Sequence, residues 1–427
     1  MILSGILASL ACLSVVLLLW QWLAARRFPL HRRVADKSFS PPVTLLKPLK
    51  GADATTAESL RSWFTQDYSG EIQILFGVAS QADPVCEIVR GLIREFPQRD
   101  VQLVVCDESL GVNAKVSKLI QLQRLAKHGI IVVSDADVRV PADLLANVVA
   151  PLREEGRAGS PLPAAGMHHD DGAHPAGAGR PTSQTAGLVN CFYRLANPTT
   201  LAMRWEAVAV NADFWSQVLQ SRSLKPLDFA LGAVMAVRRG ALEKTGGFAA
   251  LADYLADDYQ LGNKITQAGW RIELCPVPVE CWSPPMDWRA VWKHQLRWAR
   301  TIRVCQPVPY FFSILSNGTL WPLLWLLWQI PQVSLAVHEA PHILTIQTAI
   351  PHAAILATMM LAVRIVIALS LQARLTQSFK HIGDFWLVPV KDLFQAASWL
   401  AAFAGSKIEW RGVRYRLTRE GKLVKAG

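Results

Sequence analysis

The sequence places two carboxylates two positions apart, Asp135 and Asp137, directly after the apolar run Ile130 to Ser134. Oxygen ligands at this spacing suit Mg²⁺ or Mn²⁺, hard cations that proteins hold with one or two carboxylates together with substrate phosphates. Such a cation offsets the negative charge that develops on a leaving nucleoside diphosphate. The alternative is a purely local role, because Asp is also common in turns and at helix N-caps.

A second carboxylate pair, Asp257 and Asp258, lies between apolar segments. A hydroxyl that attacks the anomeric carbon of a sugar must lose its proton, and one carboxylate within hydrogen-bonding reach is sufficient as the base. Two adjacent Asp side chains cannot easily both point at one hydroxyl. We therefore expect Asp258 to be the base and Asp257 to be a supporting or helix-capping residue.

Asp83 follows the apolar run Ile72 to Val78 and precedes Pro84. In this position it could receive the uracil or ribose of a nucleotide. It could also cap a helix that has Pro84 as its first residue, and the two roles are compatible. Asp83 is therefore a candidate donor-binding residue.

A basic, Trp-containing segment follows later in the chain, from Lys293 to Arg300. Residues three or four apart share one face of a helix, so His294, Arg297 and Trp298 would lie together. Arg can clamp phosphate oxygens, and Trp can pack on a sugar or a lipid chain. An amphipathic helix at a membrane interface would show the same pattern, and both interpretations stay open.

The elements that must position these residues are short β-rich runs that alternate with helix-like segments. We expect strands at 43–46, 72–78, 101–105 and 130–134, and helices at 57–64, 84–95 and 115–127. This alternation predicts an α/β domain with a Rossmann-like, mostly parallel sheet that is covered on both faces. Ligands of such sheets bind at the carboxyl ends of the strands, which is where Asp135 and Asp137 fall.

The first apolar block, residues 2–25, carries no formal charge. About 20 apolar residues suffice to cross a bilayer as a helix. Four arginines follow within residues 26–33 and no Lys or Arg precedes the block, so we expect a transmembrane anchor followed by a cytoplasmic domain. A cleaved signal peptide is the alternative, and this charge order is the reverse of its usual one.

Apolar stretches recur near the other end of the chain, at 320–337, 343–363 and 385–404. The last contains Lys391 and Asp392, which are costly inside a span unless they face protein or water, so it could also be interfacial or re-entrant. We expect two to four membrane-associated helices over residues 318–404. Residues 405–427 are basic and are expected to form a cytoplasmic tail that suits an anionic leaflet.

Composition excludes several classes of protein. The net charge of +11 raises nucleic acid as a partner, but the basic residues cluster beside the apolar blocks, so we expect the lipid bilayer as the partner and no nucleic acid. The seven cysteines include no CxxC pair, which disfavours a disulfide framework or structural zinc site. Residues 154–184 are rich in Gly, Pro and Ala, and we expect a flexible inserted loop.

Taken in chain order, seven stretches resemble the ceramide glucosyltransferase family and its bacterial relatives, including the glycosyltransferases of hopanoid lipid biosynthesis. They are PVTLLKPLKG (42–51), ADP (82–84), GVNAKVSKL (111–119), SDADVRV (134–140), FALGAVMAVRR (229–239), GGFAALADYLADDYQLG (246–262) and HQLRWARTIR (294–303). The resemblance implies a cytoplasm-facing GT-A domain over residues 40–310. Members of this family transfer a hexose, usually glucose from UDP-glucose, to a lipid hydroxyl with inversion.

The resemblance also implies roles for individual residues. Donor binding would fall to Asp83, Asn113, Lys115, Asp135 and Asp137, with the metal at Asp135 and Asp137; Asp258 and Asp257 would be catalytic; and His294, Arg297 and Trp298 would form the family's RW motif. Two positions depart from the family pattern. Ser80 stands where relatives often carry Asp, and His294 replaces a Gln or Arg, which weakens any charge-based role because His can be neutral near pH 7.

The resulting hypothesis is a membrane-bound UDP-sugar-dependent glycosyltransferase with a lipid acceptor such as ceramide. Sugar transfer to a hopanoid lipid is an alternative. A processive polysaccharide synthase shares the carboxylates and the RW motif, but the membrane portion looks too small for a polymer channel. An inactive lipid-binding scaffold is disfavoured because all the acidic residues remain. No pattern in the sequence indicates an oligomeric state.

Overall fold

The computed structural model describes residues 2–153, 185–339, 346–410 and 412–425. The expected insertion at 154–184 lies outside these ranges. The central element is an eight-stranded sheet with the order β3-β2-β1-β4-β7-β6-β8-β5. Its strands are β1 Val43–Pro48, β2 Ile72–Val78, β3 Asp100–Val105, β4 Ile130–Ser134, β5 Val138–Arg139, β6 Ala186–Leu195, β7 Val234–Arg238 and β8 Arg271–Cys281.

The first half of the sheet is parallel, as the sequence predicts. Strands β3, β2, β1 and β4 pair in parallel, and β2 and β4 have the expected bounds. In the second half, β7 is antiparallel to both β4 and β6, while β6 and β8 are parallel. The sheet is therefore mixed, and its parallel half ends in the loop that carries Asp135 and Asp137.

Helices cover both faces of the sheet. Successive residues of a strand point to opposite faces, so neighbouring strand residues belong to different buried clusters. Leu46 belongs to one buried cluster together with Leu119 of α4 (Ala114–Leu125). Leu45 belongs to a second cluster together with Leu60 of α2 (Thr56–Phe64). The helix α3 (Val85–Glu95) joins α2 in the second cluster. This three-layer arrangement is the α/β architecture that the alternating pattern predicts.

The remaining helices of the sheet domain follow β4. They are α5 Leu144–Val149, α6 Leu201–Val208, α7 Trp215–Leu224, α8 Arg239–Lys244, α9 Asp257–Gln267, α10 Trp288–Cys305 and α11 Pro307–Phe312. A π-helical turn, Ala209–Phe214, joins α6 to α7. Such turns are rare in proteins, and those that occur are often found at functional sites.

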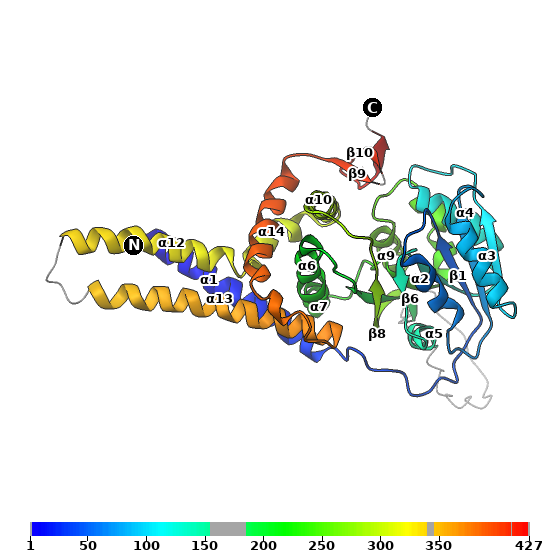
Figure 1. Cartoon of the computed structure of the whole chain (residues 1–427), viewed down its shortest axis with the longest axis horizontal. Helices are drawn as coiled ribbons and strands as arrows, with labels where there is room; N and C mark the ends of the chain where they lie inside the picture. The colour runs from blue at the N-terminus through cyan, green and yellow to red at the C-terminus, as the bar shows by residue number, and fades with distance from the viewer. Residues whose placement is uncertain (1, 154–184, 340–345, 411, 426–427) are drawn as a thin grey trace, which may run out of the picture.

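Long apolar helices extend away from the sheet domain, side by side (Figure 1). They are α1 Ile2–Arg27, α12 Leu320–Glu339 and α13 Ile346–Thr376. Within the described ranges, two helices are long and apolar enough to cross a membrane, Ile2–Arg27 and His352–Thr376. A bent pair, Pro307–Ser316 with Leu320–Gln329, would make a third if it forms one span.

The helix α14 (Leu387–Phe403) contacts α12 and α13 on one side and α6 and α10 of the sheet domain on the other (Figure 1). It carries the pair Lys391 and Asp392, and both side chains are buried in protein. The cost of two charges in an apolar segment is thus met by protein partners.

The described residues after Gly405, at 406–410 and 412–425, differ from the expected tail, because they form a small antiparallel sheet. Its strands are β9 Lys407–Trp410, β10 Val413–Leu417 and β11 Leu423–Lys425. Ile408, Tyr415, Leu417 and Leu423 are buried in a cluster of their own, which also contacts the sheet domain through Leu255. The alternation of these apolar residues with basic ones is the pattern of a sheet with one buried face.

Candidate active site

A cavity of about 1110 Å³ lies at the carboxyl ends of β1 and β4. Its wall includes Pro48 at the end of β1, Asp135 after β4, Asp258 at the start of α9 and Trp298 on α10. Volumes of several hundred Å³ suit drug-sized ligands, so this cavity has room for a nucleotide-sugar and part of a second substrate. Its position at the strand ends is the one that the parallel sheet predicts.

Lys115 connects the two carboxylate pairs. Its Nζ lies 2.9 Å from Oδ1 of Asp135 and 3.0 Å from Oδ2 of Asp257. Although burial alone would lower the pKa of Lys115, the nearby carboxylates Asp135, Asp257 and Asp258 outweigh it and raise that pKa above its usual range. The ammonium therefore stays charged and holds together loops that lie far apart in the sequence.

Asn113 places Lys115 at this point. Its side chain accepts hydrogen bonds from the backbone N–H groups of Lys115 (3.0 Å) and Val116 (3.2 Å), which caps α4. Its Nδ2 donates to the carbonyl of Tyr254 at 2.8 Å. Asn113 is fully buried and is not among the residues that line the cavity, so the structure places it behind the site.

Asp258 lies at the cavity wall in the first turn of α9. The N–H of Tyr259 donates to its Oδ1 at 2.8 Å. Burial, with a smaller effect of the neighbouring charge on Asp257, raises the pKa of Asp258 to about 6. A carboxylate of this kind accepts a proton more readily than an ordinary Asp and is still ionised near neutral pH.

Asp135 and Asp137 both line the cavity. The side chain of Asp137 meets the solvent of the cavity, but protein surrounds it on the other sides. This burial, followed by the charge of Asp135, raises the pKa of Asp137 to about 6. Beneath them, Lys47 Nζ donates to the carbonyl of Asp135 at 2.7 Å and to Oγ of Ser134 at 3.1 Å, which fixes the end of β4.

The donor set fits a divalent cation only when a substrate completes it. Within the described ranges, no group of three or more His, Cys, Asp or Glu side chains converges on one point. Asp135 and Asp137 supply oxygen ligands, and Mg²⁺ commonly takes one or two carboxylates and fills its remaining positions with phosphates and water. The two side chains therefore fit such a cation together with a diphosphate.

The RW segment lies on the cavity side of α10, since His294, Arg297 and Trp298 all line the cavity. Nδ1 of His294 lies 2.6 Å from Oε1 of the fully buried Glu206, and Nε2 of Gln295 donates to the same oxygen at 2.7 Å. This contact fixes the ring of His294 and leaves its Nε2 as the other hydrogen-bonding atom.

Trp298 packs between two rings. Its centroid is 4.5 Å from that of His294 and 6.3 Å from that of Phe214, which ends the π-helical turn. The indole is thus held rigidly at the cavity wall. Asp287 caps the start of α10, since its side chain accepts a hydrogen bond from the N–H of Ala290 at 2.7 Å.

Asp83 lies one step away from the cavity and is not among its lining residues. Its carboxylate accepts hydrogen bonds from the N–H of Gly51 at 3.0 Å and from the N–H of Val85 at 3.1 Å. It therefore holds the turn before α3 and the loop after β1, while Pro84 occupies the N-cap position of α3 instead of the first helical position expected for it. Gly51 lines the cavity and has a φ of +72°, a conformation that Gly adopts readily.

The same loop contains a cavity-lining carboxylate that the sequence analysis missed, Asp53. Burial opposes its ionisation, but hydrogen bonds from Thr55 and Thr56 outweigh burial and hold the pKa of Asp53 below its ordinary value. The signal was present, because Lys50 and Asp53 follow the first predicted strand at its carboxyl end.

The C-terminal sheet holds the loop that precedes Asp257. The N–H of Leu423 donates to the carbonyl of Asp253 at 2.7 Å, and the N–H of Leu255 donates to the carbonyl of Gly421 at 3.3 Å. From the other side, the N–H of Val112 donates to Oδ1 of Asp253 at 3.0 Å. The loop is therefore clamped between the start of α4 and the end of the chain.

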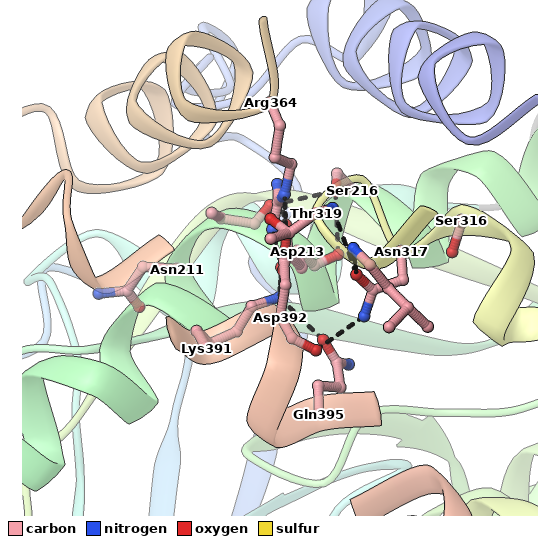
Figure 2. Close-up of polar contacts among 12 residues, drawn as sticks. Asn211, Asp213, Ser216, Ser316, Asn317, Thr319, Arg364, Lys391, Asp392 and Gln395 are labelled. Atoms are coloured by element: carbon pink, nitrogen blue, oxygen red, sulfur yellow. Dashed lines mark hydrogen bonds and ion pairs between the residues drawn. The ribbon is translucent and has the colours of Figure 1, made fainter. Parts of the chain in front are cut away.

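The cavity also reaches the apolar helices. Leu18 and Gln21 of α1, Arg364 of α13 and Asp392 of α14 line it together with the carboxylates described above. Figure 2 shows the side chain of Arg364 reaching from α13 toward Asp213 of the π-helical turn and Asp392 of α14, with which it forms hydrogen bonds. One continuous space thus connects the sheet edge with the long apolar helices that are candidate membrane spans.

Comparisons with known proteins agree with this architecture. The chain is similar to ceramide glucosyltransferase 3 of Caenorhabditis elegans, with 23% identity over 258 residues that cover 60% of this chain and 49% of the relative. It is similar to the ceramide glucosyltransferase of Candida albicans, with 32% identity over 128 residues that cover 27% of this chain and 24% of the relative. The chain thus matches about half or less of the length of these relatives.

A solved structure shows the same fold. A mannosyltransferase from Pyrobaculum calidifontis, in complex with GDP-Man and Mn²⁺, matches with a TM-score of 0.50 and 20% identity over 94% of this chain and 99% of that chain. The expected GT-A fold is thereby confirmed. Residues 6–169 and 178–423 match the sequence profile of glycosyl transferase family 21, which includes both the sheet domain and the apolar helices. The chain belongs to glycosyl transferase family 21, the family that the seven motif stretches indicate.

Proposed function

We propose that this glycosyltransferase transfers a hexose, glucose from UDP-glucose, to the hydroxyl of a membrane lipid of the ceramide type. The observation that carries the proposal is the single cavity that reaches from Asp135 and Asp258 to Leu18 and Arg364 on the membrane helices. A soluble acceptor would need no such connection. The relatives named ceramide glucosyltransferase support the choice of donor and acceptor.

In this proposal the donor lies over the carboxyl ends of β1 and β4. The loop that contains Lys50 and Asp53 borders its nucleotide, and Asp135 and Asp137 face its diphosphate. These two carboxylates would hold Mg²⁺ or Mn²⁺, which when bound offsets the charge of the leaving diphosphate. Arg297, also at the cavity wall, adds a permanent positive charge on the α10 side.

Asp258 is the proposed base. Its raised pKa of about 6 leaves it ionised near neutral pH and able to take the proton of the lipid hydroxyl as that oxygen attacks the anomeric carbon. Asp257 is held by the Lys115 ammonium at 3.0 Å, so it supports the loop while Asp258 remains available. Attack on the face opposite the leaving diphosphate inverts the anomeric centre.

The lipid approaches from the bilayer, between α1, α13 and α14. The arginines that follow residues 2–25 favour the cytoplasmic side for the sheet domain, where nucleotide-sugars are available. Asp258 therefore meets the acceptor at the cytosolic boundary of the membrane.

The test is the fate of the sugar. The purified chain in phosphatidylcholine nanodiscs is supplied with radiolabelled UDP-glucose, Mg²⁺ or Mn²⁺, and a ceramide. We expect label in the organic phase as a single glycolipid, and we expect a chelator to abolish its formation. Label that stays in the aqueous phase as a polymer would instead identify a polysaccharide synthase, and no transfer from any UDP-hexose to any lipid would contradict the proposal.

A further inference from the structure

Tyr193 lines the cavity and lies on β6, close to the end of that strand at Leu195. We infer that its hydroxyl donates a hydrogen bond to a ring hydroxyl of the donor's hexose, and that this contact helps to select the hexose. The inference rests on the proposed function and deepens it, because it assigns a residue to the choice of sugar.

The order of the strands places Tyr193 beneath the loop that carries Asp135 and Asp137. This loop leads from β4 to β5, and β7, β6 and β8 lie between these two strands in the sheet. The N–H of Asp135 donates to the carbonyl of Ala233, just before β7, at 3.3 Å. The N–H of Trp282, just after β8, donates to the carbonyl of Asp137 at 3.0 Å. The loop is tied to the strands on both sides of β6 and therefore crosses the end of β6.

The hexose must lie in this part of the cavity in the proposed reaction. The diphosphate faces Asp135 and Asp137, whereas the attacking hydroxyl meets Asp258 on the opposite side of the anomeric carbon. Asp258 packs against Gly232, which precedes β7. Tyr193 therefore lies on the strand next to the proposed base and under the loop of the two other carboxylates, which is where the sugar ring would meet the wall.

The π-helical turn holds the end of β6 in place. The N–H of Leu195 donates to Oδ1 of Asn211 at 2.9 Å, and Nδ2 of Asn211 donates back to the carbonyl of Leu195 at 3.1 Å. From the same turn, the ring of Phe214 packs on that of Tyr193, with the centroids 5.3 Å apart. The phenol thus has a fixed position before a substrate binds, which reduces the cost of forming a selective contact.

The pairing of β6 with β8 is irregular at the same point. Cys191 pairs with Cys275, but Tyr193 pairs with Val279, so residues 276–278 of β8 lie opposite a single residue of β6. A register shift of this kind is what a β-bulge produces, and bulges next to active sites often re-aim a side chain. The irregularity supports a functional position for Tyr193.

The hydroxyl of Tyr193 is available to a ligand. Among the residues that the structure describes, none forms a hydrogen bond with it, and it is not one of the enclosed polar atoms that lack a partner. It is therefore open to the cavity. Burial, followed by the charges of nearby groups that include Asp258 and Asp135, raises the pKa of Tyr193 well above its usual range. The phenol stays protonated and can act as a donor.

Two other tyrosines at the cavity wall already have partners. The hydroxyl of Tyr259 donates to the carbonyl of Cys305 at 3.0 Å and accepts from Nε2 of Gln306 at 2.9 Å. The hydroxyl of Tyr310 donates to the carbonyl of Trp399 at 3.4 Å. Tyr193 differs from both, because its hydroxyl is left for a molecule in the cavity.

A sugar hydroxyl is the ligand that suits this donor. The phenol is neutral and has carboxylates nearby, so it offers a diphosphate no counter-charge, whereas a ring hydroxyl needs only a hydrogen bond. Binding sites commonly use a few placed polar groups to orient a ligand. A site built to bond a substrate hydroxyl also rejects an analogue that lacks it, so the contact contributes to specificity.

The experiment measures donor binding by calorimetry, with UDP-glucose and with UDP, on the full chain in detergent with Mn²⁺ present. Tyr193→Phe removes only the hydroxyl. We expect its affinity for UDP-glucose to fall about 10-fold, as for one lost hydrogen bond, and its affinity for UDP to stay within about 2-fold of the wild type. The matched control is Tyr68→Phe, since the hydroxyl of Tyr68 donates to the carbonyl of Pro41 and Tyr68 is not among the residues that line the cavity. This control should bind both ligands like the wild type.

Mono-deoxy analogues of UDP-glucose then identify the contact. The analogue that lacks the bonded hydroxyl should bind equally to the wild type and to Tyr193→Phe, whereas the others should keep the difference of about 10-fold. Equal UDP-glucose affinity in the wild type and Tyr193→Phe, an equal loss of affinity for UDP, or a difference that persists with every analogue would each overturn the inference. Failure of the wild type to bind UDP-glucose would also overturn it.

Binding and transfer distinguish this inference from the proposed function. If Tyr193→Phe loses affinity for UDP-glucose as expected, but no sugar is ever transferred to a lipid, the Tyr193 contact stands and the proposed function fails. If transfer to a lipid occurs with the same KM for UDP-glucose in the wild type and Tyr193→Phe, the proposed function stands and the inference is wrong.

Discussion

Gly232 lies directly against Asp258, since a β-carbon on Gly232 would stand 2.7 Å from Oδ2 of the carboxylate. No side chain fits at position 232 unless Asp258 moves. Gly232 precedes β7, the antiparallel strand between β4 and β6, so the sheet itself determines where the proposed base can lie. The contact joins the middle of the sheet to the first turn of α9.

The substitution Gly232→Ala should therefore displace Asp258 and lower kcat. We expect a loss of about 10- to 100-fold, because a shift of about 1 Å in a reacting group can have an effect of this size. Donor affinity, measured by calorimetry, should change little. Gly240→Ala is the matched control, since a β-carbon there meets nothing within 4 Å. Equal kcat in the two variants would show that Asp258 tolerates displacement.

The pH dependence of transfer follows from the pKa of Asp258, which burial and the nearby Asp257 raise to about 6. A base acts in its deprotonated form, so kcat should increase with pH through about 6 and level off above about 7. Asp257→Asn removes a neighbouring negative charge and should move the midpoint to lower pH. A profile of log kcat between pH 5 and 8 checks this, and a flat profile would exclude a group with this pKa.

The C-terminal sheet should matter for turnover although it contributes no proposed catalytic residue. Leu423 is 2% exposed, so Leu423→Ala should loosen the sheet by about 2–5 kcal/mol and release its hold on Asp253. Hydrogen exchange of residues 252–258 should become faster, and transfer should slow. The control is Val424→Ala, since Val424 is 42% exposed. Unchanged exchange in Leu423→Ala would show that the loop holds its position without the sheet.

The buried ion pairs of Arg364 should dominate the attachment of α13 to the sheet domain. Arg364→Met leaves Asp213 and Asp392 with fewer cations, and breaking a buried pair typically costs about 3–5 kcal/mol. Arg33→Met removes a surface pair with Asp143 and should cost less than about 1 kcal/mol. Denaturant unfolding in detergent compares the two. Equal losses of unfolding free energy in the two variants would mean that the buried Arg364 pairs contribute no more to stability than a surface pair.

The sequence predicted the parallel half of the sheet well, because apolar runs such as Ile72–Val78 and Ile130–Ser134 are continuous and their neighbours are clearly helical. From this it follows that Asp135 lies at the ligand-binding edge. The sequence could not show that Lys115 bridges Asp135 to Asp257, because that contact depends on the antiparallel strand β7 and on the packing of α9.

Two expectations about polar residues were incomplete for the same reason. Asn113 was expected at the donor, but its hydrogen bonds cap α4 and hold Tyr254. Lys391 and Asp392 were judged costly inside a membrane span unless they face protein or water, and the sequence could not name their partners because Asp213 and Arg364 lie far away along the chain. A local sequence pattern shows that a charged residue needs a partner. Which residue is the partner depends on the tertiary structure.

At the C-terminus the sequence analysis expected a basic tail, whereas the structure contains the small sheet of β9, β10 and β11. The basic residues after Gly405 drew attention to charge, while the buried face of Ile408, Tyr415 and Leu423 is short and interrupted by turns. A period of two over so few residues is a weak signal, and the sheet is stabilised partly by contacts with Leu255 and Val304 of the sheet domain.

The most direct test of the account is the substitution Asp258→Asn, which keeps the shape of the side chain and removes the proposed base. Single-turnover transfer of glucose to ceramide should fall by about 100- to 10,000-fold, while UDP-glucose binding by calorimetry stays within about 2-fold of the wild type. Asp143→Asn, which changes a surface ion pair only, should leave both quantities unchanged. Transfer by Asp258→Asn at the wild-type rate would contradict the assignment of Asp258 as the base.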